Sequence, residues 1–147
     1  MPDHEALLRA IFEQAGVGVA LVEAPSGRLV EANQRLADLL GYAVDELTTL
    51  DFAELTHPDD LGEDLATMRR VVTGEVRGFT REKRYLRKDG TPVWVSLTVT
   101  PLWRPGEVPT SNLTLVEDIR RRKQIEEELG LRLAALRESE GRFRALF

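Results

Sequence analysis

Residues 79–100, with the sequence FTREKRYLRKDGTPVWVSLTVT, decide the fold. The triplet Lys88-Asp89-Gly90 is typical of a tight turn between two antiparallel strands. After that turn, apolar residues occupy every second position, which is the period of a half-buried strand. These residues are Val93, Val95, Leu97 and Val99. The stretch therefore predicts a β-hairpin with strands over 79–86 and 92–100.

The flanking sequence completes an α+β domain. From the N-terminus, the predicted elements are a helix over 5–15, a hairpin of strands over 17–23 and 29–32, a helix over 33–41, short helical turns within 43–61, a helix over about 61–72, the hairpin above, and a last strand over 112–117. Asn33 can cap the second helix and Gly41 can end it. This order predicts an antiparallel sheet with helices on one face. We divide the chain into a flanking helix (1–15), the domain (16–118) and a long C-terminal helix (119–147).

Charge is unevenly distributed along the chain, although the net charge is only −5. Between Asp45 and Asp64 there are eight acidic residues and no Lys or Arg, whereas the segment from Arg69 to Lys88 holds eight basic residues. A nucleic-acid-binding protein would show one dominant basic face with interleaved aromatic residues. We instead expect the two blocks to be neighbours in one fold, or else separate solvated faces. Nucleic acid is not an expected partner.

Composition excludes several other classes of protein. The chain has 147 residues and no cysteine, so disulfides, thiol nucleophiles and cysteine-based metal sites are excluded. No apolar run approaches the roughly 20 residues of a membrane span, and the N-terminus lacks a secretory pattern. We therefore expect a cytoplasmic protein without membrane contact through this segment.

Four motifs in this order resemble those of the PAS family, the small sensory modules of bacterial signalling proteins. They are Gly27-Arg28-Leu29-Val30-Glu31-Ala32-Asn33, Leu39-Leu40-Gly41-Tyr42, His57-Pro58-Asp59-Asp60, and Glu82-Lys83-Arg84-Tyr85-Leu86-Arg87-Lys88-Asp89-Gly90 with Trp94 four residues later. The resemblance implies a five-stranded antiparallel sheet and a sensory role without catalysis. A small molecule is often held between the sheet and the helices of such domains.

The resemblance also implies a signal relay at the end of the last strand. PAS domains commonly end there in an Asp-Ile-Thr-like triplet, which here is Asp118-Ile119-Arg120. Asp118 and Ile119 are therefore the expected relay residues. The arginine departs from the family pattern and leaves the partner of Asp118 open, and the bases within 81–88 are candidates. Alternatively, Asp118 only caps the helix that follows.

Catalytic and cofactor chemistry are poorly supported. The chain has two histidines, no phosphate-binding glycine loop and no nucleophile arrangement, so we predict neither an enzyme nor a metal site. We interpret His57 as a structural loop residue. Haem-binding members of the family use a histidine near the position of Glu63, and residues 61–74 contain none. A cysteinyl flavin is excluded, and Val116 stands where flavin binders often have glutamine. A non-covalent flavin remains an alternative.

Alternation along the strands and helices indicates which residues face the interior. The candidate pocket residues are Ala20, Val22, Ala32, Leu36, Leu55, Met68, Val72, Leu97 and Val116. This set is apolar throughout, so it describes either an ordinary packed core or a pocket for a small apolar ligand. We predict no specific cofactor.

Two surfaces indicate a homodimer. Trp94 lies on the outer face of the predicted sheet, where an exposed aromatic side chain is expected to be buried by a contact. The candidates for this contact are the leading helix and a partner's copy of it, through Leu8, Ile11 and Phe12. The C-terminal helix carries apolar residues at alternating three- and four-residue steps, interrupted by Glu140. They are Leu129, Leu133, Leu136, Phe143 and Phe147. This seam predicts a coiled coil, or alternatively a helix folded back on its own sheet.

The end of the chain repeats its beginning. Leu7-Leu8-Arg9-Ala10-Ile11-Phe12 resembles Arg142-Phe143-Arg144-Ala145-Leu146-Phe147, which suggests the start of a tandem PAS repeat. We interpret the chain as a sensory and dimerisation module of a longer protein. The effector domain would lie in the same chain and be of the histidine kinase or cyclic-dinucleotide synthase type. The alternatives are a ligand-free dimerisation scaffold and a sensor with a bound flavin.

Overall fold

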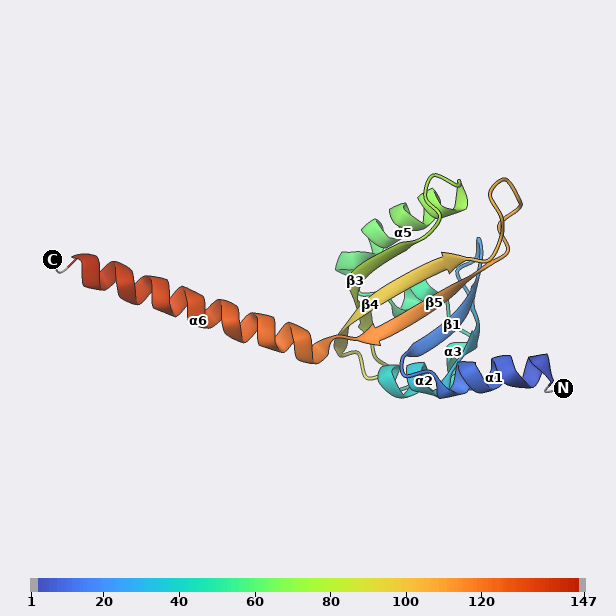
Figure 1. Cartoon of the computed structure of the whole chain (residues 1–147), viewed down its shortest axis with the longest axis horizontal. Coiled ribbons are helices and arrows are strands. Elements are labelled where there is room, and N and C mark those ends of the chain that lie inside the picture. Colours follow the sequence, from blue (N-terminus) through green and yellow to red (C-terminus); the bar gives the residue numbers. More distant parts are fainter. Residues whose placement is uncertain (1–2, 146–147) are drawn as a thin grey trace.

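The computed structural model describes residues 3–145, with side chains described through Arg142. Phe147 and the end of the predicted tandem repeat lie outside the described residues, as does the side chain of Phe143. The elements are α1 (His4–Gln14), β1 (Gly18–Glu23), β2 (Leu29–Ala32), α2 (Gln34–Leu40), α3 (Val44–Leu47), α4 (Phe52–Leu55), α5 (Pro58–Val72), β3 (Phe79–Leu86), β4 (Pro92–Pro101), β5 (Ser111–Asp118) and α6 (Arg120–Ala145). The predicted α+β architecture is confirmed (Figure 1).

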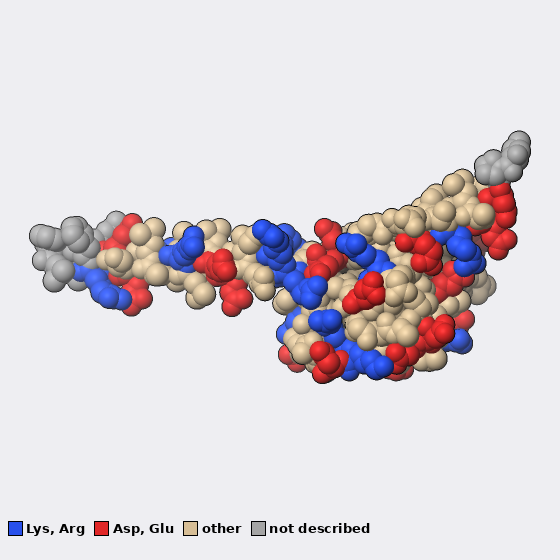
Figure 2. Space-filling view, turned by 90° about the horizontal axis from the view of Figure 1, so that it is seen from below, with Lys and Arg blue, Asp and Glu red and all other residues tan. Residues whose placement is uncertain are grey.

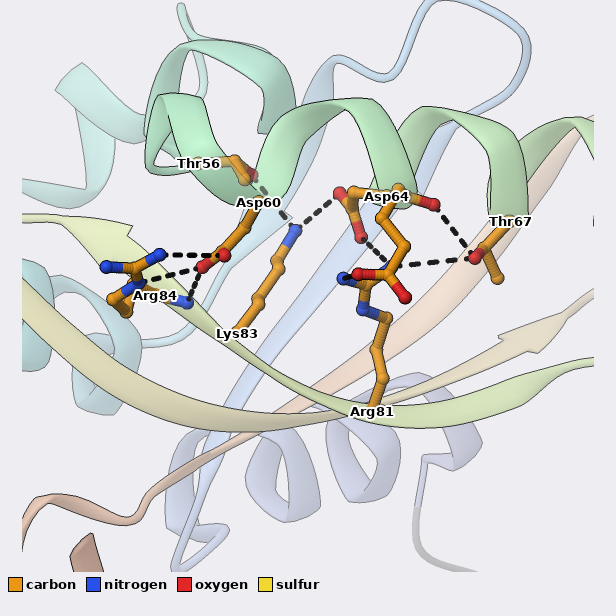
Figure 3. Close-up of polar contacts among 8 residues, drawn as sticks. Thr56, Asp60, Asp64, Thr67, Arg81, Lys83 and Arg84 are labelled. Atoms are coloured by element: carbon orange, nitrogen blue, oxygen red, sulfur yellow. Dashed lines mark hydrogen bonds and ion pairs between the residues drawn. The ribbon is translucent and has the colours of Figure 1, made fainter.

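The five strands form one antiparallel sheet in the order β2-β1-β5-β4-β3, so β2 and β3 are the edge strands. Burial alternates along β4 as predicted, because successive side chains of a strand point to opposite faces. The inner face packs on α2, α3 and α4 in a single core that includes Leu36, Leu47 and Leu55. Helix α5 lies along β3 on the same side (Figures 1 and 3).

Asn33 holds the first hairpin and α2 together. Its side chain is fully buried, and its Oδ1 accepts hydrogen bonds from the backbone N–H groups of Leu36 and Val19, at 3.1 and 2.9 Å. Its Nδ2 donates to the carbonyl oxygens of Phe12 and Val17. The predicted cap is thus confirmed, and it also anchors the end of α1 to the sheet. Gly41 ends α2 with a φ of 78°, a conformation that favours glycine.

The acidic and basic segments of the sequence are neighbours, as expected. Lys88 pairs with Glu46, Arg84 with Asp60, Lys83 with Asp64, and Arg81 with Glu63. On the face of the molecule that Figure 2 shows, charges of both signs are interspersed. The two blocks therefore largely neutralise one another within the fold.

Helix α6 leaves the end of β5 and extends away from the domain (Figure 1). Its first turns contact β4 and form ion pairs with Glu82 of β3. Its apolar residues are exposed, among them Leu129, Leu133 and Leu136. Within this chain α6 does not fold back on the sheet, so the alternative of a folded-back helix is wrong. No helix in residues 3–145 is both long and apolar enough to cross a membrane.

Candidate functional site

A small cavity lies between the inner face of the sheet and the helices. Its volume of about 30 Å³ leaves room for one or two water molecules. Six of the predicted pocket residues line it, namely Ala20, Val22, Leu36, Leu55, Met68 and Leu97. Ala32 and Val116 are buried in the same core without lining the cavity, and Val72 lies instead on a groove on the outer side of α4 and α5.

One wall of this cavity carries polar side chains that the predicted set does not include, although the surface of the cavity is mostly apolar. Asp64, Lys83, Asn112 and Thr114 line it together with Tyr85. Lys83 points inward because it alternates along β3 with residues of the outer face. Its partner Asp64 lies one helical turn after Asp60 on α5. Lys83 lies on the same face of β3 as Arg81 and Tyr85. A lysine at this position of a predicted strand was the one signal in the sequence that could have revealed the polar wall.

Lys83 and Asp64 form a buried ion pair (Figure 3). Lys83 Nζ lies 2.6 Å from Asp64 Oδ2, and the two side chains are 2% and 3% exposed. Lys83 also donates to the hydroxyl of Thr56 at 3.0 Å, and that hydroxyl donates to the carbonyl oxygen of Phe52. Hydrogen bonds of this kind are needed because a buried charge without partners is very costly.

Burial sets the electrostatics of this wall. Desolvation lowers the pKa of Lys83, and the neighbouring carboxylate of Asp64 opposes this effect. Burial likewise raises the pKa of Tyr85, whose ring centroid lies 4.8 Å from Lys83 Nζ. The ring of Phe52 is 5.4 Å from the same atom. The ammonium group is thus held by one carboxylate, one hydroxyl and two aromatic rings.

Arg84 and Asp60 close the free edge of β3 beside the cavity (Figure 3). The guanidinium of Arg84 donates to both carboxylate oxygens of Asp60, at 3.1 and 2.9 Å, and the backbone N–H of Arg84 donates to the same carboxylate. The side-chain hydrogen bonds from Arg84 hold the pKa of Asp60 below its usual value. His57 donates its backbone N–H to the carbonyl oxygen of Arg84. The edge strand is therefore bound to α5 through both its backbone and its side chains.

At the end of β5, Asp118 binds the first residue of α6. Its Oδ1 accepts the backbone N–H of Arg120 at 3.0 Å, and its carboxylate pairs with the Arg120 guanidinium at 2.7 Å. Burial raises the pKa of Asp118, but the hydrogen bonds from Arg120 outweigh this effect and lower it overall. Of the candidate partners within 81–88, none forms an ion pair with Asp118 among the described residues, and those at 81, 83, 84 and 88 are paired with acids of the 45–64 block.

The group that binds α6 to the sheet is Glu82, which sequence reasoning missed. Its carboxylate pairs with Arg122 at 2.5 Å and with Lys123 at 2.9 Å. Hydrogen bonds from these two bases lower the pKa of Glu82. Lys123 Nζ also lies 4.4 Å from the ring centroid of Trp94. We name this set, Glu82 with Trp94, Arg122 and Lys123, the α6 clamp.

Trp94 and Ile119 connect the clamp to the end of β5. The buried residue Ile119 donates its backbone N–H to the carbonyl oxygen of Trp94 at 3.2 Å. Within one chain, α6 covers Trp94, whereas α1 lies at the opposite edge of the sheet beside Glu31. The expectation that the chain's own leading helix covers Trp94 is therefore wrong. Leu8 and Ile11 are exposed on α1, and Phe12 is half-buried and lines the same surface hollow as Glu31.

No group of three or more metal-binding side chains lies together in the part of the chain that the structure describes. His57 caps α5, because its Nδ1 accepts the backbone N–H of Asp59 at 3.1 Å. This geometry agrees with a structural role for the histidine.

Comparisons with known proteins agree with this architecture. The family model described as the PAS fold matches residues 6–119. The chain is similar to the probable diguanylate cyclase DgcE of Escherichia coli (strain K12), with 32% identity over 142 residues, which cover 95% of this chain and 13% of DgcE. It is also similar to the sensor histidine kinase TmoS of Ectopseudomonas mendocina, with 26% identity over 125 residues, which cover 85% of this chain and 13% of TmoS.

Among solved structures, the PAS domain of a protein from Colwellia psychrerythraea is similar in fold. It superposes with a TM-score of 0.72 at 19% identity and covers 81% of this chain and 99% of that structure. At this level of identity the likeness concerns the fold alone. The chain thus spans 13% of the length of both curated relatives and nearly the whole of an isolated domain.

Proposed function

The chain belongs to the PAS family, and from this premise we propose that it is a non-catalytic sensory module that passes a conformational change through α6 to an effector domain in the same polypeptide. Two of its curated relatives are a probable diguanylate cyclase and a sensor histidine kinase, and the matched segment is a small part of each. An effector of one of these two types is therefore part of the proposal.

The observation that carries the proposal is the position of β3 between two helices. On its inner face, Lys83 and Arg81 bind the acidic side chains of α5. On its outer face, Glu82 binds the first turns of α6. Residues one position apart on a strand thus connect a helix of the sensory core to the output helix. A shift of α5 would move β3 and change the α6 clamp, which is the kind of two-state element that a switch requires.

Asp118 and Ile119 complete the proposed relay. Asp118 fixes the start of α6 through Arg120, and Ile119 fixes it to β4 through Trp94. Movement of β3 would also reach the start of α6, because Arg84 of β3 is paired with Trp94 on the neighbouring strand β4. The clamp and the Asp118 junction therefore act on the same first turn of α6.

We further propose that α6 pairs with its copy in a parallel homodimer. The helix has 26 residues, so it extends about 39 Å at 1.5 Å per residue. Leu129, Leu133 and Leu136 lie along it and are all exposed within one chain. Burial of such residues is the main source of coiled-coil stability. Leu8, Ile11 and Phe12 of α1 are a second candidate contact.

The rival function, a dimerisation scaffold without a ligand, has one observation in its favour. The interior cavity has room for only one or two water molecules. A scaffold would set the spacing of two effector domains without responding to a core signal. The two functions differ in whether a change inside the domain alters the output.

The substitution Glu82→Gln in the full-length protein tests the relay. It keeps the shape of the side chain and removes the charge that holds Arg122 and Lys123. Glu117→Gln is a matched control, because Glu117 lies in the same row of the sheet, across Ser96 from Glu82, and makes no ion pair with any described residue. We expect a change in effector activity for the first variant at an unchanged melting temperature, and none for the control. Equal activity of the two variants would contradict the relay.

A further inference from the structure

The apolar seam of α6 changes character near the start of the helix. Counted backwards from Leu129 in alternating steps of three and four, its next positions are Glu126, Arg122 and Ile119. Leu129 and the two seam leucines after it are exposed, whereas Ile119 is buried in the domain. Between them lie two charged side chains, and we name this pair, Arg122 and Glu126, the polar start of the seam.

The polar start is bound within its own chain. Arg122 pairs with Glu82 of β3 through one guanidinium nitrogen and with Glu126 through another, the latter at 2.9 Å. Ile119, at the level before them, packs into the domain. While the α6 clamp is closed, these positions are therefore held by the domain, and the seam is open to a second helix from Leu129 onward (Figure 1).

A second copy of the chain offers Arg122 another carboxylate. In a parallel coiled coil the two helices are in register, so a seam residue meets residues of the same and the neighbouring level on the other helix. Arg122 and Glu126 are neighbouring levels, about 6 Å apart along the axis at 1.5 Å per residue. The long side chain of Arg122 can span this rise and the distance between the helices, so the partner subunit's Glu126 is a complementary charge for it.

The two carboxylates lie on different sides of Arg122. Glu82 belongs to the outer face of β3, whereas the partner subunit's Glu126 would lie across the seam of the two helices. The Arg122 side chain is half exposed, so it is free to turn from one side to the other. We infer that Arg122 exchanges between Glu82 and the partner subunit's Glu126, and that opening of the α6 clamp extends the coiled coil of two copies toward the domains through the levels of Glu126 and Arg122.

This inference rests on the proposed parallel dimer and names the contact through which the clamp acts on it. The levels from Arg122 to Leu129 make up one heptad, which is about 10 Å of helix. Pairing from Leu129 onward is present in both states, so the exchange changes where the coiled coil begins without separating the two copies. A shift of β3 would in this way alter the spacing of the first turns of the two α6 helices.

The dimer dissociation constant of the whole chain, measured by sedimentation equilibrium, tests the exchange. Glu82→Gln releases Arg122 from β3, so we expect the dissociation constant to fall about fivefold, the gain from two partly exposed ion pairs per dimer. In a Glu126→Gln background the same substitution should leave the constant unchanged, because the alternative carboxylate is then missing. Glu117→Gln is again the control and should dimerise as the wild type does.

Two results of this cycle would overturn the inference. One is a Glu82→Gln dimer that is no tighter than that of the wild type. The other is a gain of equal size in the Glu126→Gln background, because Arg122 would then have no partner that explains it.

Disulfide cross-linking locates the point where the helices begin to pair, and the chain has no cysteine of its own. Ile125 is exposed beside Glu126, so Ile125→Cys reports on the polar start. We expect its cross-linking to be slower than that of Leu133→Cys, and to accelerate severalfold when Glu82→Gln is added. Leu133→Cys should cross-link at the same rate with and without Glu82→Gln. Leu131→Cys, on the opposite side of the helix, is the control and should cross-link least.

The cross-linking rates separate failure of this inference from failure of the proposed function. If Leu133→Cys reacts no faster than Leu131→Cys, α6 does not pair through its seam, and both the dimer and the inference fail. If Leu133→Cys cross-links but Ile125→Cys does not respond to Glu82→Gln, the dimer stands and the inference is overturned. If the Glu82→Gln dimer tightens while the effector activity is unchanged, the proposed relay fails and the exchange stands.

Discussion

The buried pair Lys83–Asp64 allows a prediction whose size follows from the structure. Its two side chains are 2% and 3% exposed, and its atoms are 2.6 Å apart. Removal of one partner leaves an uncompensated buried charge, which typically destabilises a protein by about 3–5 kcal/mol. Replacement of both by apolar side chains of similar size is often neutral or stabilising. We therefore expect a loss of about this size for each single variant, Lys83→Met and Asp64→Leu, and recovery of most of it in the double variant.

The surroundings of the pair predict an asymmetry between the two single variants. After Lys83→Met, the carboxylate of Asp64 still has Arg81 at 3.9 Å. After Asp64→Leu, no carboxylate within ion-pair distance of the Lys83 ammonium remains among the described residues. Asp64→Leu should therefore be the more destabilising substitution.

Urea unfolding measures these free energies, with the fluorescence of the buried residue Trp103 as the probe. Lys88→Met is the matched control, because Lys88 lies 2.7 Å from Glu46 but the two side chains are 54% and 43% exposed. This control should unfold at the urea concentration of the wild type, since exposed ion pairs contribute little. The reasoning is refuted if the two single losses simply add in the double variant.

Three further predictions concern the core, the acid stability and the oligomeric state. Leu97→Ala should lower the free energy of unfolding by about 2–5 kcal/mol, measured in urea, because Leu97 is buried; a loss below about 0.5 kcal/mol would contradict its inward position. The pKa of Asp60 is lowered in the folded state, so its ion pair with Arg84 stabilises the fold above the usual pKa of 3.8 and less as the pH falls below that value. The difference in unfolding free energy between the wild type and Asp60→Asn should therefore shrink from pH 6 to pH 3, and a constant difference would count against it. Deletion of residues 120–147 should raise the dimer dissociation constant in light scattering while the domain stays folded by circular dichroism, and an unchanged dimer would exclude the α6 seam.

Local patterns in the sequence were sufficient for most of the fold. The alternation of β4, the cap at Asn33 and the helix end at Gly41 depend on residues close together in the chain, and the structure has each of them. The pairing of the acidic and basic blocks was one of the two arrangements that the sequence allowed, because opposite charges in one small domain attract. The order of charges in the sequence does not predict which acidic residue pairs with which basic residue.

The site was less predictable, because its contacts join residues far apart in sequence. Lys83 meets Asp64 nineteen positions away, and Arg122 meets Glu82 forty positions away. Both contacts depend on how β3 is registered against α5 and on the direction in which α6 leaves the sheet. An apolar interior was therefore expected where a charged wall exists. The sequence points to Asp118 and Ile119 as relay residues, whereas Glu82 forms ion pairs with two residues of α6.

The edge position of β3 explains why this strand can serve as the connection. A central strand is held by ladders on both sides, whereas β3 has only β4 as a neighbour. Its free edge is occupied by α5 contacts, since Arg84 donates its N–H to Asp60 and accepts the N–H of His57. A change in α5 therefore acts on β3 without breaking the other strand pairs. Because side chains of a strand alternate between faces, the same displacement moves Lys83 in the core and Glu82 at α6 together.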